Sequence, residues 1–224
     1  MHLACGSLLD LLNPDPALID LRDGVPRALA HQPRFAAQAP YERQYSVAQH
    51  CILGALALEQ ETGNPQLAMH FLLHDAHEAF IGDLTRPFQN ALAMAIAQVG
   101  NEDIEPHPAL LRAAEETLAI ALNKVKRKLA CAIYAAAHIA PPSAMERDQI
   151  HDMDMRMLRW ERDHILTNPR GNLWQPDVET AEPIKSMCCL ANHIWRPTES
   201  LKRWIAVFDD LKSQIIARSA RQCQ

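Results

Sequence analysis

The sequence places two adjacent metal-ligating side chains, His74 and Asp75, in an apolar run that we expect to be a buried helix. Burying an unpaired charge is costly or forces the group to become neutral. Ionisable groups in such a run therefore need a compensating partner. A divalent cation would satisfy both side chains, so the pair predicts a catalytic metal site.

Histidine and aspartate side chains on other expected helices extend this set of candidate ligands. His50 lies on a helix that should begin near Ser46, and Asp152 and Asp154 lie on a helix expected over 144–166. Two imidazoles and two carboxylates suit Mn, Fe, Co, Zn or Mg, with the nitrogen ligands arguing mildly against a pure Mg site. The two aspartates face opposite sides of a helix, and either is a plausible fourth ligand.

Two further acidic residues follow the His-Asp pair and are candidates for moving protons. At helical spacing, Glu78 falls on the same face as His74, one turn later, within reach of a water molecule at the metal. Asp83 lies just beyond the expected helix end, where it can enter the same pocket or cap the next helix. Neighbouring carboxylates push their pKa values apart, which suits proton transfer.

The composition favours an all-α fold. Hydrophobic residues make up 48% of the chain and glycine occurs only 7 times, while alternating β-branched runs are almost absent. Such a chain can bury a substantial core. The expected helices cover 46–63, 65–82, 88–99, 109–138, 144–166 and 198–218.

The chain is expected to form a single domain over 1–224. Prolines allow only short helical turns in 13–45, which predicts a loop-rich N-terminal lead-in. The core should cover about 30–166. The rest, 167–224, should consist of an extended loop followed by an amphipathic helix, whose apolar stripe either docks on the core or joins two copies, docking being favoured.

Charge and cysteine usage restrict the classes of partner and compartment. The formal charge is −5 with acidic and basic residues interspersed, so we expect no nucleic-acid polymer as partner. The 6 cysteines show no CxxC spacing, which indicates a reducing compartment. No leader and no long apolar run is seen, so we expect a cytoplasmic protein without membrane insertion.

Three of the segments above together resemble the HD-domain phosphohydrolases, and within them the bacterial 5′-deoxynucleotidase branch with its phage-encoded relatives. Residues 45–50 read Tyr-Ser-Val-Ala-Gln-His, 74–78 read His-Asp-Ala-His-Glu, and 82–87 read Gly-Asp-Leu-Thr-Arg-Pro. The resemblance spans roughly residues 10–165, and the run 74–83 is its most specific part.

The resemblance implies an HD-domain helical bundle that binds one divalent metal ion, of unspecified identity, through His50, His74, Asp75 and Asp154. Asp154 is preferred to Asp152 because it opens a run ending in Glu-Arg, as in the phage-type members. Glu78 and Asp83 match the carboxylates with which the family activates water and manages protons.

The resemblance also assigns residues outside the helices. Arg34 looks like the phosphate-binding arginine of the family and Phe35 like its aromatic neighbour. The deoxynucleotidases carry a tryptophan there, so the smaller ring does not predict strict deoxyribose selection. His70 and His77 flank the His-Asp pair at helical spacing and invite assignment as additional ligands, or as ligands to a second metal, but the family gives no support for that. We expect His70 to be a hydrogen-bonded helix residue and His77 to orient a ligand without touching the ion.

The implied activity is metal-assisted hydrolysis of a small nucleotide, most simply a deoxynucleoside 5′-monophosphate split to nucleoside and phosphate. Arg34 would neutralise charge on the phosphoryl oxygens, Glu78 would deprotonate water and Asp83 would protonate the leaving oxygen. A deoxynucleoside triphosphate triphosphohydrolase and a catalytically idle nucleotide-binding protein stay open as alternatives.

Other branches of the family are argued against by single positions. Alarmone hydrolases carry Glu-Asp where this chain has Glu78-Ala79, and hydrolases of cyclic-di-GMP carry a Gly-Tyr-Pro element that is missing here. Relatives commonly dimerise, which keeps a homodimer as an alternative use of the last helix.

Overall fold

Helix α2 is the central element of the fold, and local sequence signals set both of its ends. The computed structural model describes residues 1–39, 42–100, 105–166, 174, 176–184 and 193–222. Helix α2 covers Val47–Thr62, and the Ser46 side chain accepts a hydrogen bond from the backbone N–H of Gln49 at its start. Its end is Gly63 at φ 60°, a left-handed conformation that glycine adopts without strain.

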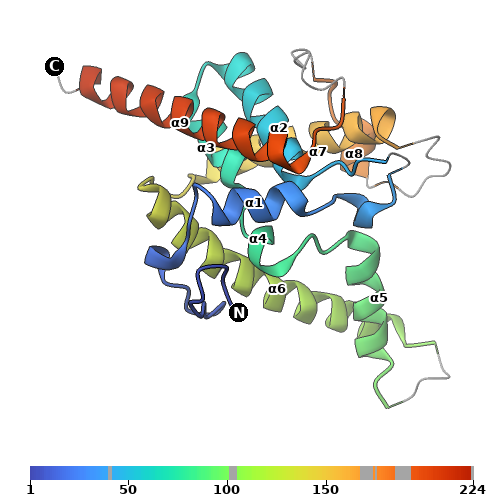
Figure 1. The fold of residues 1–224 in the computed structure, drawn as a ribbon. Coiled ribbons are helices and arrows are strands. Elements are labelled where there is room, and N and C mark those ends of the chain that lie inside the picture. The colour runs from blue at the N-terminus through green and yellow to red at the C-terminus, as the bar shows by residue number, and fades with distance from the viewer. Residues whose placement is uncertain (40–41, 101–104, 167–173, 175, 185–192, 223–224) are drawn as a thin grey trace.

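The all-α prediction is confirmed for the described residues, which contain helices and two isolated β-bridges but no β-strand (Figure 1). The helices are η1 Pro16–Leu18, α1 Gly24–His31, η2 Phe35–Ala37, α2 Val47–Thr62, α3 Pro65–Leu73, α4 Glu78–Ile81, α5 Arg86–Ala97, α6 Pro108–Ala137, α7 Ala144–His164, α8 Pro176–Thr180 and α9 Pro197–Gln222. Among the described residues, no helix combines the length and apolar character needed to cross a membrane.

Helices α2 and α3 form the closest pair, because α2 has a glycine where α3 brings an aromatic ring. A Cβ atom on Gly54 would lie 2.1 Å from a ring carbon of Phe71. The ring of Phe71 in turn lies against the imidazole of His74, with 4.4 Å between the ring centres. This close approach brings one end of each helix to the His-Asp pair.

The single helix predicted over 65–82 is wrong, because α3 ends at Leu73 and α4 begins only at Glu78. Between them, backbone N–H groups at 74, 76 and 78 donate to carbonyls three residues earlier. Such 3-10 winding advances about 120° per residue instead of about 100°. The prediction that His74 and Glu78 lie on one helix face is therefore wrong.

The N-terminal segment is more helical than predicted. Helix α1 contains Pro26 within its first turn, where the backbone N–H needs no helical partner and proline is tolerated. Its buried face, with Val25 and Leu29, packs against α2 and α9. The prolines of this region therefore mark helix starts as well as breaks.

The last helix, α9, packs against α1, α2 and α3 (red in Figure 1). Its apolar stripe carries Trp204, Phe208 and Leu211, each at most 3% exposed and part of the main core. The core therefore extends beyond the expected 30–166 at both ends. The expected loop at 167–183 contains the short helix α8, and its residues 167–173 and 175 lie outside the described residues.

Candidate metal centre

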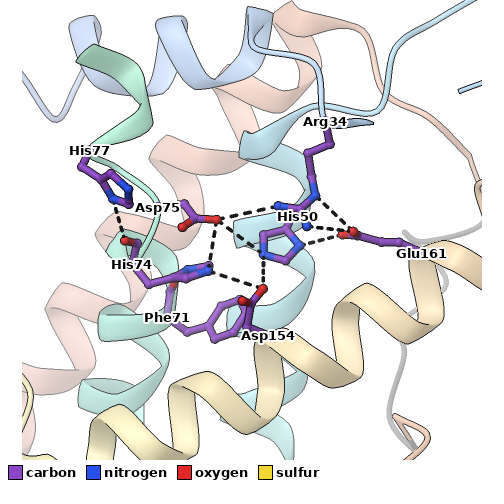
Figure 2. A network of polar contacts seen from close by, with 8 residues as sticks. All are labelled: Arg34, His50, Phe71, His74, Asp75, His77, Asp154 and Glu161. Carbon is purple, nitrogen blue, oxygen red and sulfur yellow. Dashed lines mark hydrogen bonds and ion pairs between the residues drawn. The ribbon is translucent and has the colours of Figure 1, made fainter. Parts of the chain in front are cut away.

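The structure brings the four predicted ligands together from three parts of the chain (Figure 2). His50 comes from α2, His74 and Asp75 from the turn after α3, and Asp154 from α7. Nε2 of His50 lies 3.3 Å from Oδ1 of Asp154, and Nε2 of His74 lies 3.2 Å from Oδ2 of Asp75. The crossed distances are 3.8 Å for His74–Asp154 and 3.9 Å for His50–Asp75.

Both imidazoles are held so that Nε2 faces the carboxylates. Nδ1 of His50 donates to Oε1 of Glu161 at 2.6 Å, and Nδ1 of His74 donates to the backbone oxygen of Phe71 at 2.6 Å. Each Nε2 is buried and has no hydrogen bond to any described residue. A lone pair fixed in this way is the usual arrangement of a metal-binding histidine.

The charges of the cluster favour a cation. Burial raises the pKa of Asp154, but the facing rings of His50 and His74 hold it well below its usual value. Burial lowers the pKa of His74, but Asp75 and Asp154 raise it well above its usual value. Positive charge is therefore attracted to the point where the four side chains meet.

These side chains can hold a metal ion. One donor atom from each of His50, His74 and Asp75 lies within 4.8 Å of the others, and Asp154 closes the set through its contacts with both rings. Two imidazole nitrogens with carboxylate oxygens suit several divalent transition metals.

The choice between the two aspartates of α7 is clear from their surroundings. The side chain of Asp152 is 65% exposed and lies 3.6 Å from Nη1 of Arg156 on the outer face. The side chain of Asp154 is 27% exposed and faces His50. Helix α7 begins with a capping box between Ser143 and Glu146.

Glu161, which sequence reasoning did not assign, joins the candidate ligand His50 to Arg34. Its side chain is fully buried, and its two oxygens contact Nδ1 of His50 and the guanidinium of Arg34, with Nε at 3.1 Å and Nη2 at 3.0 Å. Burial raises the pKa of Glu161, but Arg34 and His50 bring it below its usual value. The available signal was its spacing of seven residues from Asp154, which puts both on one helix face.

Arg34 lies beside the centre, as the resemblance implied. Its Nη1 is 3.7 Å from Oδ2 of Asp75, and its backbone N–H donates to the carbonyl of Tyr45 just before α2. Phe35 follows with its ring centre 5.8 Å from the guanidinium carbon. The φ angles of Phe35, Ala36 and Ala37 are 55°, 49° and 61°, left-handed values that are strained for residues with a side chain.

Glu78 and Asp83, the two carboxylates predicted to transfer protons, have pKa values that are shifted by charges of the centre. Burial raises the pKa of Glu78 to about 9, and the negative charges of Asp75 and Asp83 add to this shift. Asp83 is half-buried in the loop between α4 and α5, and its pKa is raised by burial and by Asp75. The capping alternative does not apply, because the N-cap of α5 is Thr85.

The two flanking histidines differ in their contacts. Nε2 of His70 hydrogen-bonds the backbone oxygen of Ala140 at 3.0 Å, as expected for a hydrogen-bonded helix residue, while its Nδ1 is buried without a hydrogen bond to a described residue and lies 3.7 Å from Oε1 of Glu146. Nδ1 of His77 donates to the backbone oxygen of His74 at 3.1 Å, while its Nε2 is buried and has no hydrogen bond to a described residue. Burial lowers the pKa of His77 to about 4, so the ring is neutral at neutral pH.

The chain is similar to a known protein over only part of its length. No protein-family model matches the chain. An uncharacterized protein of Rhodobacter capsulatus is 30% identical over 102 residues, which is 44% of this chain and 50% of that protein. The chain thus matches about half the length of this relative, and the function must be argued from the site itself.

Proposed function

We propose that the protein is a metal-dependent phosphohydrolase of the HD type that converts deoxynucleoside 5′-monophosphates to nucleoside and inorganic phosphate. The observation that carries the proposal is the convergence of His50, His74, Asp75 and Asp154 on one point, with neither Nε2 hydrogen-bonded to a described residue. The meeting of four such side chains, and not an unbonded ring nitrogen by itself, favours a metal, because the buried Nδ1 of His70 also lacks a hydrogen bond to a described residue.

A divalent cation held there would supply Lewis-acid polarisation of a phosphoryl oxygen and would acidify a water molecule. The mixed nitrogen and oxygen donors favour Mn, Fe, Co or Zn over Mg. Arg34 offers a planar fork for the non-bridging oxygens of the phosphate. Glu161 holds the other edge of that guanidinium, so Arg34 is aimed before the substrate arrives.

Glu78 and Asp83 are the groups that we assign to proton transfer. The pKa of Glu78 is raised to about 9 by burial and by its acidic neighbours, so positive charge in the centre brings that pKa down toward the working range of a base. Asp83, whose pKa burial also raises, keeps a proton more readily than an exposed aspartate and suits protonation of the leaving oxygen.

The test is a phosphate-release assay on protein that has been stripped of metal and reloaded separately with Mn, Co, Fe, Zn and Mg. Deoxynucleoside and ribonucleoside mono-, di- and triphosphates serve as substrates. We expect inorganic phosphate from 5′-monophosphates with at least one transition metal, and weaker turnover with Mg. Release of intact triphosphate as the sole product would replace the proposal with the triphosphohydrolase alternative. No turnover with any metal would leave a nucleotide-binding protein.

A further inference from the structure

His77 has the same local arrangement as the two histidines of the metal centre. In all three rings Nδ1 donates to a protein oxygen, and Nε2 is buried without a hydrogen bond to any described residue. The residue is only 7% exposed. His70 also has one buried ring nitrogen without such a bond, with Glu146 at 3.7 Å, whereas His77 belongs to a group of three possible ligands.

Two carboxylates lie next to this free nitrogen. One donor atom from each of Asp75, His77 and Glu78 lies within 4.8 Å of the others. Glu78 is 8% exposed, and its Oε2 is also buried without a hydrogen bond to a described residue. The group therefore has two unsatisfied donor atoms, both more than nine-tenths buried, facing a common neighbourhood.

The backbone explains why these residues meet. The N–H of Glu78 donates to the carbonyl of Asp75 at 2.9 Å, which is a 3-10 type bond, and residues three apart are eclipsed in such a turn. His77 is directed by its bond to the carbonyl of His74 (Figure 2). A regular helix through 74–78 would place Asp75 and His77 on opposite sides.

Asp75 can serve both groups of ligands. Its contacts with Arg34, His50 and His74 are all made through Oδ2. Oδ1 is therefore the oxygen that can turn toward His77 and Glu78. A carboxylate that binds with both oxygens is a common bridge between two cations, and paired metal ions in hydrolases lie about 3.5–4 Å apart.

We propose that His77, Glu78 and the second oxygen of Asp75 form a binding site for a second divalent transition-metal ion, so that the protein holds a two-metal centre. The inference rests on the proposed function only through Asp75. When the second ion is bound, Glu78 is a ligand and Asp83 is the carboxylate left for proton transfer. The weaker ligand set, with one nitrogen, predicts that this ion binds less tightly than the first.

Lys126 on α6 is a cationic side chain outside the first centre that opposes the second ion, beside Arg34, whose charge also acts on Glu78. The charge of Lys126 acts on both His77 and Glu78, yet Lys126 forms no ion pair with either within the described part of the chain. Removal of this like charge in Lys126→Ala should therefore strengthen the second binding step several-fold and leave the first nearly unchanged.

The test is to titrate the whole metal-stripped chain with Mn²⁺ and to monitor binding by calorimetry and by electron paramagnetic resonance. We expect two ions per chain and a spectrum broadened by coupling between neighbouring Mn²⁺ ions. His77→Ala should bind one ion with the sharp six-line spectrum of an isolated Mn²⁺. Its remaining ion shows that the variant is folded. His70→Gln, which changes a buried histidine outside the group, is the matched control and should bind two.

The outcomes separate this inference from the proposed function. A single ion in the unmodified protein, or two ions retained in His77→Ala, would overturn the second site while leaving the first centre intact. No ion bound at all would overturn both. As a second variant, Glu78→Gln should weaken the second binding step at least tenfold without changing the first, and an unchanged second step would contradict the assignment.

Discussion

Glu161 contacts both the candidate ligand His50 and the arginine beside it, so one buried carboxylate positions two groups of the site. Glu161→Gln keeps the size of the side chain but removes the charge that orients His50 and balances Arg34. We expect metal affinity to fall about 10–100-fold, as is typical when such supporting groups are changed. Titration with Mn²⁺ measures this directly.

A matched control is available near the end of α2, where another glutamate pairs with an arginine of α7. Glu61 forms a two-bond ion pair with Arg156, at 2.9 and 2.8 Å, away from the ligands. Glu61→Gln should lower stability without changing metal affinity. Equal losses of affinity in both variants would mean that Glu161 acts only by supporting the fold.

The two aspartates of α7 provide a second residue-level prediction. Asp154→Asn removes the negative charge of a predicted ligand. Metal affinity should fall by more than about 100-fold, which exceeds the loss expected when a residue that only supports a ligand is changed. Asp152→Asn should bind metal normally, because its side chain is exposed and paired with Arg156. Metal content after dialysis distinguishes the two, and the reverse order would contradict the assignment.

At the scale of helices, the α2–α3 contact controls the placement of His74. In Gly54→Ala the new methyl group meets the Phe71 ring at 2.1 Å, and this ring lies against His74. We expect a loss of about 1–3 kcal/mol in the free energy of unfolding, together with weaker metal binding. Thermal unfolding measures the first effect and Mn²⁺ titration the second.

The smaller side chain in Phe71→Leu should partly rescue Gly54→Ala, because it removes the ring that the methyl group strikes. The two changes should then be non-additive in the free energy of unfolding. Simple additivity would show that the close approach is relieved elsewhere.

The stability of the contact between α3 and the start of α7 should depend on pH, because His70 lies in this contact. Burial lowers the pKa of His70, although Ala140 and Glu146 oppose the shift. Below about pH 6.5, His70 is protonated in the unfolded chain but stays neutral in the folded protein. The free energy of unfolding therefore falls as the pH drops from there toward the lowered pKa. His70→Gln should show a shallower loss over this window in chemical denaturation. Parallel curves would exclude the effect.

The helices that the sequence predicted well are those whose signals are local. Ser46 marks the start of α2 through its side chain, and Gly63 marks the end through its backbone conformation. The break at 74–77 was missed because an apolar run reads as one helix unless the tertiary contacts of His74 and His77 are known. Glu161 was missed for a similar reason, since its partner Arg34 lies 127 residues away in the chain.

For the whole molecule, the metal should act as a link between distant segments. The ligands come from residues 50, 74–75 and 154, so a cation bound only by the folded state must stabilise it. At 100 times its Kd an ion adds about 2.7 kcal/mol, or roughly 5–10 °C in Tm for a chain of this size. Scanning calorimetry with Mn²⁺ and with a chelator checks this. Asp154→Asn should show a smaller difference, and an equal shift in that variant would mean that Asp154 is not a ligand.

The left-handed segment at 35–37 has a consequence for how the protein meets its ligand. Each such residue costs about 1–3 kcal/mol, which glycine at Ala36 or Ala37 would partly recover. Under the proposed function, this free energy is spent in folding, so an incoming phosphate would meet a guanidinium that Glu161 already holds in place.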